Sequence, residues 1–583
     1  MMAGYGALLW LVPAWPLLLA LSLTLRAVRP YGIRLLPWAL LPAALVWLVA
    51  GAAQLGWLDW LYFDWLYFDW PLFLYAPDLL MGTRITLDSL SYIWLSLALF
   101  VWGAAAWHSS WVKDRQAWRF SLFFLLSLSG SLGLSLAGDA ISFYLMFSLM
   151  SLAAWGLVIH EQTDFAKRAA YWYLILAVLA ELVLFAGIVV RAAELGSTDL
   201  AVWAVSGSSQ WGLWLIWLGL AVKVGVPLLH LWLPLAHPAA PVSASAVLSG
   251  VMIKAGIIGW WLLMPSWVMQ DSVFVSFMPW LGVATMVFGA VFGLMQTDPK
   301  AVLAYSSISQ MGWLIWGIGW VWQGAEPNLL IIWVAWFALH HALIKGGLFL
   351  GVGWIKYSTA AQGFIPWVWG GLILLGLLLA GIPFSAGAWL KMQMKLASAD
   401  VGLVMPYWLL LLGSLATVLL MIHFLRRLAK LDAVSPDQAK PVSRMALVSW
   451  FGLVALAASW IYWVAMPSWD SGALVDAFKP IVIGLILATA WRIRIHRQIQ
   501  SPPGDMVVLL EWFGRRLAAW GEGYQQAYQR LQFRIQAGWQ SMSQGYQSFL
   551  QHADNAEKNL LNWPRFMQLI GGLALVFWLL LIL

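Results

Sequence analysis

Four lysines lie inside stretches of the sequence that are otherwise almost entirely apolar: Lys223, Lys254, Lys345 and Lys391. Only 10% of all residues are charged, so these four stand out. A charged side chain at the centre of a membrane helix costs at least ~2.5–3.5 kcal/mol, and ionisable groups there usually mark a path for ions or protons. A single lysine near a helix end can extend its amine to the membrane surface, but that explains four poorly. The pattern therefore indicates proton or ion transfer within a membrane.

The composition agrees with this interpretation. Of 583 residues, 62% are hydrophobic and 45 are Trp, which is more apolar material than the core of a water-soluble protein could bury. The sequence has no Cys, which excludes disulfides, thiolate chemistry and iron–sulfur ligation. Any redox centre would therefore lie in a partner subunit, and we do not expect the chain to be an enzyme alone. We also expect no cofactor, no bound metal and no nucleic-acid partner.

Apolar stretches of about 20 residues predict sixteen membrane-spanning helices. They lie at residues 5–25, 35–53, 86–107, 119–137, 140–160, 169–191, 209–233, 244–264, 273–296, 301–321, 328–355, 366–392, 404–424, 445–465, 473–491 and 566–583. Basic residues such as Arg26 and Arg426 fall in alternate loops, and acidic residues such as Asp199 fall in the others. The positive-inside rule then predicts a multi-pass protein of the bacterial inner membrane with both termini outside the cytoplasm.

The last ~80 residues have a different pattern. From Leu517 to Phe549, aromatic and apolar residues recur every three or four positions, which is typical of an amphipathic helix on the order of 50 Å long. We expect this helix to lie along the membrane surface, with a soluble coiled coil as the alternative. Farther upstream, the tandem repeat WLYFDWLYFDW at 60–70 is interpreted as an aromatic belt at the membrane interface.

Two of the apolar helices contain a proline close to a lysine. Lys223 precedes Pro227 by four residues, and Lys391 follows Pro383. Proline removes a backbone hydrogen bond and breaks a helix, which lets water reach a nearby side chain. A pair of interrupted helices in the two halves of a chain is typical of internally repeated transporters.

The sequence around these features resembles the antiporter-like membrane subunits shared by respiratory complex I, membrane-bound hydrogenases and Mrp-type cation/proton antiporters. The resemblance rests on GLAVKVGVPLLHLWLPLAHPAAPVSASAVLSGVMIKAGIIG (219–259), TDPKAVLAYSSISQMG (297–312), HHALIKGGLFLGVG (340–353) and AGIPFSAGAWLK (380–391). It covers the third to thirteenth predicted spans, and the C-terminal region resembles the lateral helix of the distal subunit of complex I. The resemblance implies two inverted five-helix repeats, each forming a proton half-channel around a broken helix.

The resemblance also implies a role for each buried base. Lys223 would carry protons at the first broken helix and Lys391 at the second, and a central axis would join them through Lys254, His340, His341 and Lys345. His340 and His341 point ~100° apart on a helix, so we expect only one to face the axis. Burial destabilises an ammonium group and a nearby carboxylate stabilises it, so a change of charge next door can load or unload a proton.

Other polar residues of these segments allow more than one role. His230 is a candidate proton relay. His237 stands beside Pro238 and is either a relay or a cap of the connecting segment. The serines at 306, 307 and 309 are expected to bond the preceding helical turn.

One position departs from the family pattern. The family usually has a glutamate in the fifth span as partner of the first lysine, and here that position is Ser148. Glu181 lies near the middle of the next predicted span, where a carboxylate is expensive. We therefore expect Glu181 to act as the counter-charge of Lys223. The alternative is that the first channel is inactive and Glu181 pairs elsewhere.

The predicted function is that of a proton-translocating, antiporter-like subunit whose partners are other integral membrane subunits and the lipid bilayer. An Mrp-type assembly would exchange sodium or another monovalent cation for protons, whereas a complex I-like assembly would pump protons by electron transfer elsewhere. One alternative is a transport-incompetent scaffold that anchors a redox or carbonate-handling module, and another is a stand-alone carrier of an organic solute. The predicted organisation is N-terminal helices (1–110), two half-channel repeats (111–265 and 266–425), C-terminal helices (426–500), the lateral helix (501–563) and a terminal anchor (564–583).

Overall fold

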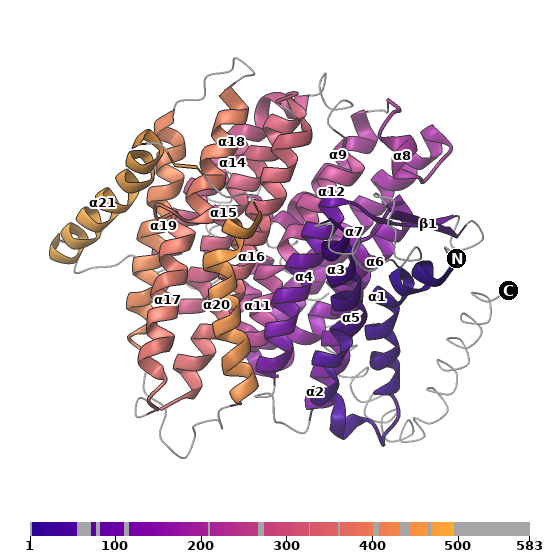
Figure 1. Ribbon diagram of the computed structural model, residues 1–583, viewed down its shortest axis with the longest axis horizontal. Helices are drawn as coiled ribbons and strands as arrows, with labels where there is room; N and C mark the ends of the chain where they lie inside the picture. Colours follow the sequence, from indigo (N-terminus) through magenta and orange to yellow (C-terminus); the bar gives the residue numbers. More distant parts are fainter. Residues whose placement is uncertain are drawn as a thin grey trace, which may run out of the picture. The chain divides into compact units, whose positions relative to one another are not determined.

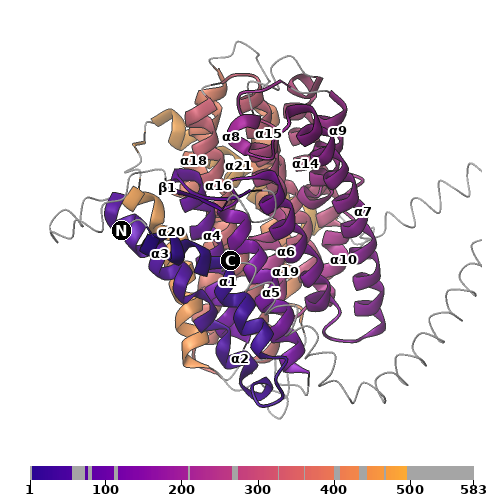
Figure 2. The same cartoon turned by 90° about the vertical axis from the view of Figure 1, so that its right-hand side faces the viewer.

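The computed structural model describes residues 3–54, 72–76, 82–109, 116–207, 210–265, 273–325, 327–359, 362–399, 407–431, 443–464, 468–469 and 471–494. The aromatic repeat at 60–70, the predicted lateral helix and the predicted span 566–583 lie outside these residues. The described part of the chain is mostly helical, and most of its long helices run roughly parallel in two perpendicular views (Figures 1 and 2).

The helices are α1 Ala3–Ser22, α2 Gly32–Leu35, α3 Leu41–Gln54, α4 Ser89–His108, α5 Ala117–Ser135, α6 Ala140–Val158, α7 Asp164–Leu195, α8 Leu200–Trp203, α9 Gln210–Val224, α10 Trp232–Ala239, α11 Val242–Gly250, α12 Ala255–Leu263, α14 Val273–Leu294, α15 Pro299–Trp322, α16 Pro327–Tyr357, α17 Ile365–Ala380, α18 Ala386–Ala399, α19 Tyr407–Leu428, α20 Arg444–Val464 and α21 Ser471–Arg494. Within the described ranges, nine helices are long and apolar enough to cross a membrane, or ten if the bent pair 29–35 and 37–52 forms one span. The chain is therefore a multi-pass membrane protein, and the count of sixteen spans remains a prediction.

Capping residues set the first turns of several helices. Asp139 accepts a hydrogen bond from the backbone N–H of Ser142 at the start of α6, over 2.7 Å. Asp298 accepts one from Ala301 at the start of α15, over 3.0 Å. Such caps satisfy N–H groups that have no partner inside the helix. They fix the residue at which each helix begins, and therefore the position of its side chains along the helix axis.

The centre of the bundle is α15. Each of its residues, from Pro299 to Trp322, is buried. It packs against α10, α14, α16 and α19, which come from both halves of the chain. Polar side chains on α15 are therefore held away from lipid and contact groups of other helices.

A β-hairpin precedes α4, and the prediction of an all-α chain is wrong here. β1 (Leu72–Ala76) pairs antiparallel with β2 (Thr83–Leu87), and Leu74 lies opposite Ile85. The predicted third span begins at 86, within β2. The helix begins only at Ser89, because Asp88 forms a capping box with Ser91 that ends the strand and starts α4.

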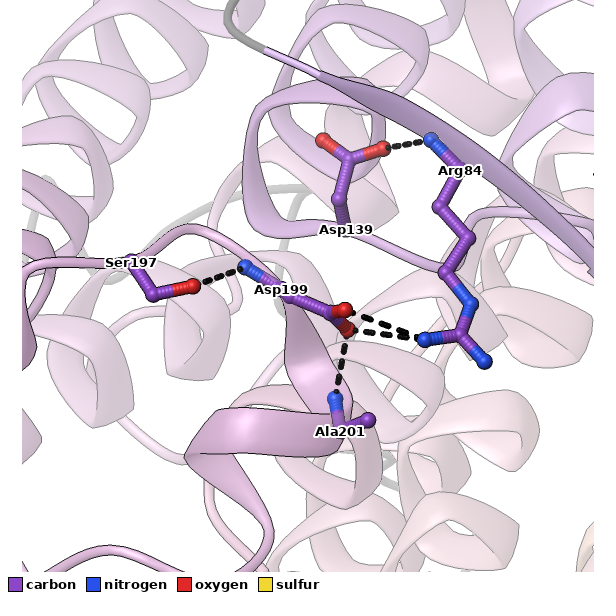
Figure 3. Close-up of polar contacts among 5 residues, drawn as sticks. All are labelled: Arg84, Asp139, Ser197, Asp199 and Ala201. Carbon is purple, nitrogen blue, oxygen red and sulfur yellow. Dashed lines mark hydrogen bonds and ion pairs between the residues drawn. The ribbon is translucent and has the colours of Figure 1, made fainter. Parts of the chain in front are cut away.

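Arg84 of β2 joins the hairpin to two helix starts (Figure 3). Its backbone N–H donates to the Asp139 carboxylate over 2.7 Å, and its guanidinium forms an ion pair with Asp199, before α8, at 3.0 Å. The Asp199 carboxylate also accepts the backbone N–H of Ala201. These bonds fix the hairpin to the N-terminal ends of α6 and α8.

Two interruptions divide long apolar segments into shorter helices. α9 ends at Val224 and α10 begins at Trp232, and the connection has left-handed backbone at Gly225 (φ 79°) and Leu228 (φ 74°). α17 ends at Ala380 and α18 begins at Ala386, with left-handed backbone at Gly381 (φ 87°) and Phe384 (φ 65°). Pro227 and Pro383 lie in these two connections. A third break separates α11 from α12 at a 3₁₀ turn, Met252–Lys254.

Candidate functional site: a row of buried bases

Glu181 on α7 and Lys223 on α9 approach the same serine of α6. The Lys223 ammonium donates to the Ser151 hydroxyl over 3.0 Å, and the Glu181 carboxylate lies close to the side chains of Ser151 and Ser148. Only 4% of Glu181 and 5% of Lys223 is exposed. The two charges interact electrostatically, with Ser151 between them. The structure therefore brings together an acid, a hydroxyl and an amine.

Aromatic rings surround the Lys223 ammonium. Nζ lies 5.1 Å from the ring centre of Trp232, 5.7 Å from that of Tyr173 and 5.8 Å from that of Phe147. The negative face of an aromatic ring attracts a cation. The Tyr173 hydroxyl also lies 3.4 Å from Nζ and donates to the Ser151 carbonyl over 2.8 Å. The pocket can therefore hold a cation although little water reaches it.

Glycines bring α7 and α9 close enough for this contact. A Cβ at Gly219 of α9 would lie 2.7 Å from the carbonyl oxygen of Ala180, and a Cβ at Gly187 of α7 would lie 2.7 Å from the Ile216 nitrogen. No side chain fits at such distances, so the backbones touch directly. Small residues at helix crossings are the usual way to bring membrane helices together. The crossing sets the distance between Glu181 and the α9 helix.

Two carbonyls and two serine hydroxyls lie between Lys254 and Lys345. The Lys254 ammonium donates to the Ser249 carbonyl over 2.6 Å, and the Ser249 and Ser307 hydroxyls are bonded at 2.7 Å. The Ser307 hydroxyl donates to the Leu303 carbonyl over 3.0 Å, and the same carbonyl accepts the Lys345 ammonium over 2.9 Å. Both lysines have 0% exposure. We call this the Lys254–Lys345 connection; it links α11, α15 and α16.

The adjacent histidines of α16 extend the row towards α17. His341 lies near enough to Lys254 and Lys345 to interact with both electrostatically. His340 Nε2 lies 3.3 Å from the Leu378 carbonyl in the last turn of α17, and its ring interacts with Lys391. Both rings are buried. Both histidines therefore interact with Lys391, and His341 also interacts with Lys254 and Lys345.

Lys391 on α18 lies beside the second interruption. Its ammonium is 3.5 Å from the Ser414 hydroxyl of α19 and 5.0 Å from the ring centre of Trp313 on α15. A Cβ placed on Gly381, the C-cap of α17, would lie 3.7 Å from this ammonium. The same residues line a pocket that continues to Asp476 on α21. Lys391 is thus buried in the wall of a mostly apolar pocket that also contains the side chains of Ser414 and Asp476.

The two histidines that follow the first interruption have different surroundings. His230 packs against Phe288 and Tyr305, with ring centres 4.7 and 5.8 Å away, and no charged group in the described ranges acts on it. The structure does not bring His230 into the row of bases. His237 stacks on Phe349 at 4.6 Å and interacts electrostatically with both ends of the Lys254–Lys345 connection.

Sequence reasoning missed the hydroxyl groups of the site. The expectation that serines of α15 bond the preceding turn holds for Ser307, which also bonds Ser249. It is wrong for Ser309, whose hydroxyl donates to the Met286 carbonyl of α14. The sequence gives no indication of a role for Ser151, apart from its position three residues after Ser148. A serine on an apolar helix usually bonds its own backbone, so sequence alone does not reveal a second partner.

These groups can take up and release protons but share few features with a catalytic centre. An amine, an imidazole and a carboxylate each exchange one proton, and hydroxyls can pass a proton between them. Two sets of interacting groups make up the site: Lys223 with Glu181, and Lys254 with Lys345, His341, His340 and Lys391. Together we call them the row of bases.

Comparison with known proteins agrees with this picture. Residues 137–420 match the family described as "NADH:quinone oxidoreductase/Mrp antiporter, TM". Hydrogenase-4 component B of Escherichia coli (strain K12) is 30% identical over 291 residues, which cover 46% of this chain and 43% of that protein. A Na(+)/H(+) antiporter subunit of Alkalihalophilus pseudofirmus is 26% identical over 306 residues, which cover 49% of this chain and 60% of that protein. In both cases the chain spans less than two thirds of the relative's length.

Two solved structures share the fold. A chain of the Mrp complex from Dietzia sp. DQ12-45-1b superposes with a TM-score of 0.63 and 20% identity, covering 83% of this chain and 99% of that chain. A chain of the membrane-bound sulfane sulfur reductase, an archaeal respiratory membrane complex, gives 0.64 and 20%, covering 82% and 99%. The protein is an antiporter-like membrane protein similar to subunits of Mrp and complex I-type complexes, which confirms the resemblance seen in the sequence.

Proposed function

We propose that this antiporter-like chain translocates protons as one subunit of a membrane complex. The Lys254–Lys345 connection is the observation that supports this most strongly. A membrane scaffold needs no charged groups in its core, and each buried ammonium lowers stability unless it is well paired. The two serine hydroxyls of the connection can each give and take a proton, whereas its carbonyls only accept hydrogen bonds, so transfer between the hydroxyls and the lysine amines would pass through water.

In this proposal each interrupted helix serves one half-channel. A proton enters from one side and loads the Lys223 amine, where Glu181 and the aromatic pocket stabilise the charge. Transfer continues along the row of bases, and Lys391 releases the proton to the other side through the pocket next to α18 that contains Ser414 and Asp476. Two inverted five-helix units would supply the two half-channels, with the lateral helix lying along adjacent membrane subunits.

The driving force would come from the rest of the complex. Because relatives include a Na(+)/H(+) antiporter subunit and an NADH-quinone oxidoreductase subunit, both exchange of sodium or another monovalent cation and redox-driven pumping fit the proposal. A transport-incompetent scaffold is the second candidate function. The observation in its favour is Ser148, which leaves the fifth span without the family's carboxylate.

Proteoliposomes that contain the complex purified with its native partners would separate the two functions. A pH-sensitive dye inside the vesicles reports proton movement after sodium addition or an imposed membrane potential. We expect Lys254→Ala to lower the initial rate at least tenfold, while Lys167→Ala, a half-exposed lysine at the start of α7, leaves it unchanged. If Lys254→Ala and Lys391→Ala both match the wild type in an assembled complex, the scaffold function is correct.

A further inference from the structure

A fifth lysine is buried close to the row of bases. Lys300 lies in the first turn of α15 and is 7% exposed. Its ammonium donates to the Ala240 carbonyl over 2.6 Å. Ala240 is the C-cap of α10, and α11 begins only at Val242, so this carbonyl lies in a gap between two helices. A cation near a helix start is unfavourable, whereas the carbonyl end of α10 attracts it.

Surface charges lie on one side of Lys300. Its ammonium interacts electrostatically with Asp298 at the start of α15, Lys356 at the end of α16 and Glu161 after α6. Glu161 and Lys356 are exposed, and Asp298 is partly exposed. The buried Lys300 amine therefore lies close to charged groups that are exposed to water. These groups are on the face of the bundle that carries the predicted basic loops.

His237 lies on the other side of Lys300. Its ring has 0% exposure and interacts electrostatically with Lys300 and with both Lys254 and Lys345. Neither ring nitrogen has a hydrogen-bond partner among the residues that the structure describes. The Ser245 hydroxyl donates to the His237 carbonyl over 2.9 Å and fixes the backbone. Buried ring nitrogens without a protein partner are usually satisfied by water, which would connect the imidazole to the amines around it.

The chain is also irregular at this point. Pro238 directly follows His237 inside α10, and Pro241 precedes α11. Proline has no N–H, so carbonyls one turn earlier lose their helical partner and remain available to water or an ammonium group. Here the His237 carbonyl, one turn before Pro241, accepts the Ser245 hydroxyl, and the Ala240 carbonyl accepts the Lys300 ammonium.

We propose that Lys300 and His237 form a proton-uptake branch that joins the surface near Glu161 and Asp298 to the Lys254–Lys345 connection. A surface carboxylic acid or hydronium gives a proton to the neutral Lys300 amine. The resulting ammonium passes a proton through water to one nitrogen of His237. The imidazolium then gives the proton on its other nitrogen to the Lys254 amine. Only N–H and O–H bonds form and break, so no other reactant is needed. This inference rests on the proposed proton translocation.

A purely structural role for Lys300 predicts different behaviour. If the ammonium only ties α15 to the gap after α10, an arginine can replace it, because a guanidinium also donates to carbonyls. Arginine stays protonated in proteins and cannot release a proton in the branch. Lys300→Arg therefore separates a structural cation from a proton carrier.

The test uses the intact complex in proteoliposomes, with assembly checked by co-purification. We expect Lys300→Arg and His237→Gln each to lower the initial rate at least tenfold while Lys167→Ala does not. The ratio of rates in H₂O and D₂O should rise in His237→Gln, because proton uptake then limits turnover. A general structural defect would lower the rate and leave this ratio unchanged.

The outcomes separate this inference from the proposed function. If Lys254→Ala is inactive and both Lys300→Arg and His237→Gln retain wild-type rates, the branch is wrong and translocation stands. If Lys254→Ala itself is fully active, proton translocation along this row is wrong. Should Lys300→Arg fail to assemble, the isotope ratio of His237→Gln decides alone, and an unchanged ratio overturns the branch.

Discussion

Glu181→Gln is the most informative single substitution, because it removes a charge while keeping the shape of the side chain. The carboxylate and the Lys223 ammonium act on each other electrostatically, as opposite charges do at a separation of roughly 4–6 Å. At an effective dielectric constant of ~20, Coulomb's law gives about 3 kcal/mol for two unit charges at that distance. This energy corresponds to about 100-fold in the population of the proton-loaded lysine. We therefore expect at least a tenfold fall in the rate of proton movement.

The assay is dye-reported proton movement in proteoliposomes of the assembled complex. Glu194→Gln is the matched control, because Glu194 is an exposed carboxylate on the same helix. A second variant tests position as well as charge. Ser148 lies beside the Glu181 carboxylate, so Ser148→Glu in the Glu181→Gln background should restore part of the rate. Restoration would mean that the pocket accepts its carboxylate from either helix.

Wild-type rates in Glu181→Gln would refute this reasoning. They would mean that the charged state of Lys223 does not depend on its neighbour, and that Ser151 and the aromatic rings are sufficient. A slow Glu194→Gln variant would also count against it, since the effect would then not be specific to the buried pair. Thermal unfolding in detergent should change little in Glu194→Gln, whereas Glu181→Gln should lower Tm, because the buried Lys223 ammonium loses its counter-charge.

Three further substitutions test other parts of the site. Ser307→Ala removes the hydroxyl between Ser249 and the Leu303 carbonyl. One hydrogen bond is worth about 1 kcal/mol, so the dye-reported rate should fall several-fold. An unchanged rate would show that protons bypass this hydroxyl. Gly219→Val would force α7 and α9 apart; we expect about 1–3 kcal/mol lower stability, measured as a lower Tm in detergent, together with slow transport. Arg84→Ala removes a partly exposed ion pair worth at most about 1 kcal/mol, so Tm should fall slightly with transport unchanged, and lost transport would give the hairpin a direct role.

Long apolar stretches made most of the described helices predictable. The span predicted at 301–321 is α15, Pro299–Trp322, and the one at 328–355 is α16, Pro327–Tyr357. The β-hairpin was not predictable in the same way, because LFLYA is too short and too apolar to distinguish from the end of a span. The break between α11 and α12 also has no sequence signal, since Met252–Lys254 contains neither proline nor glycine. Packing in the folded chain determines these features.

The basic residues of the site could be found from sequence, and their partners could not. Lys254 stands out because lysine is expensive in an apolar helix. Ser249 and Ser307 do not stand out, because a serine hydroxyl can bond its own helix at no cost. Their contact joins residues 58 positions apart and depends on how α11 packs against α15. The type and position of His230 predict a relay, and the structure places its ring against Phe288 and Tyr305, so the relay stays a prediction.

Helix interruptions explain how several ammonium groups can be buried without a carboxylate beside each one. Lys254 donates to the Ser249 carbonyl in the last turn of α11, and Lys391 lies beside Gly381 at the C-terminus of α17. Lys223 is itself in the last turn of α9. The C-terminus of a helix carries roughly half a negative charge, which favours a cation there. A full carboxylate would hold the proton more strongly, whereas a helix end stabilises the charge weakly enough for the proton to move on. The helix breaks and the lysines therefore act together. Replacing a break with continuous helix should impair proton transfer even when the lysine is still present.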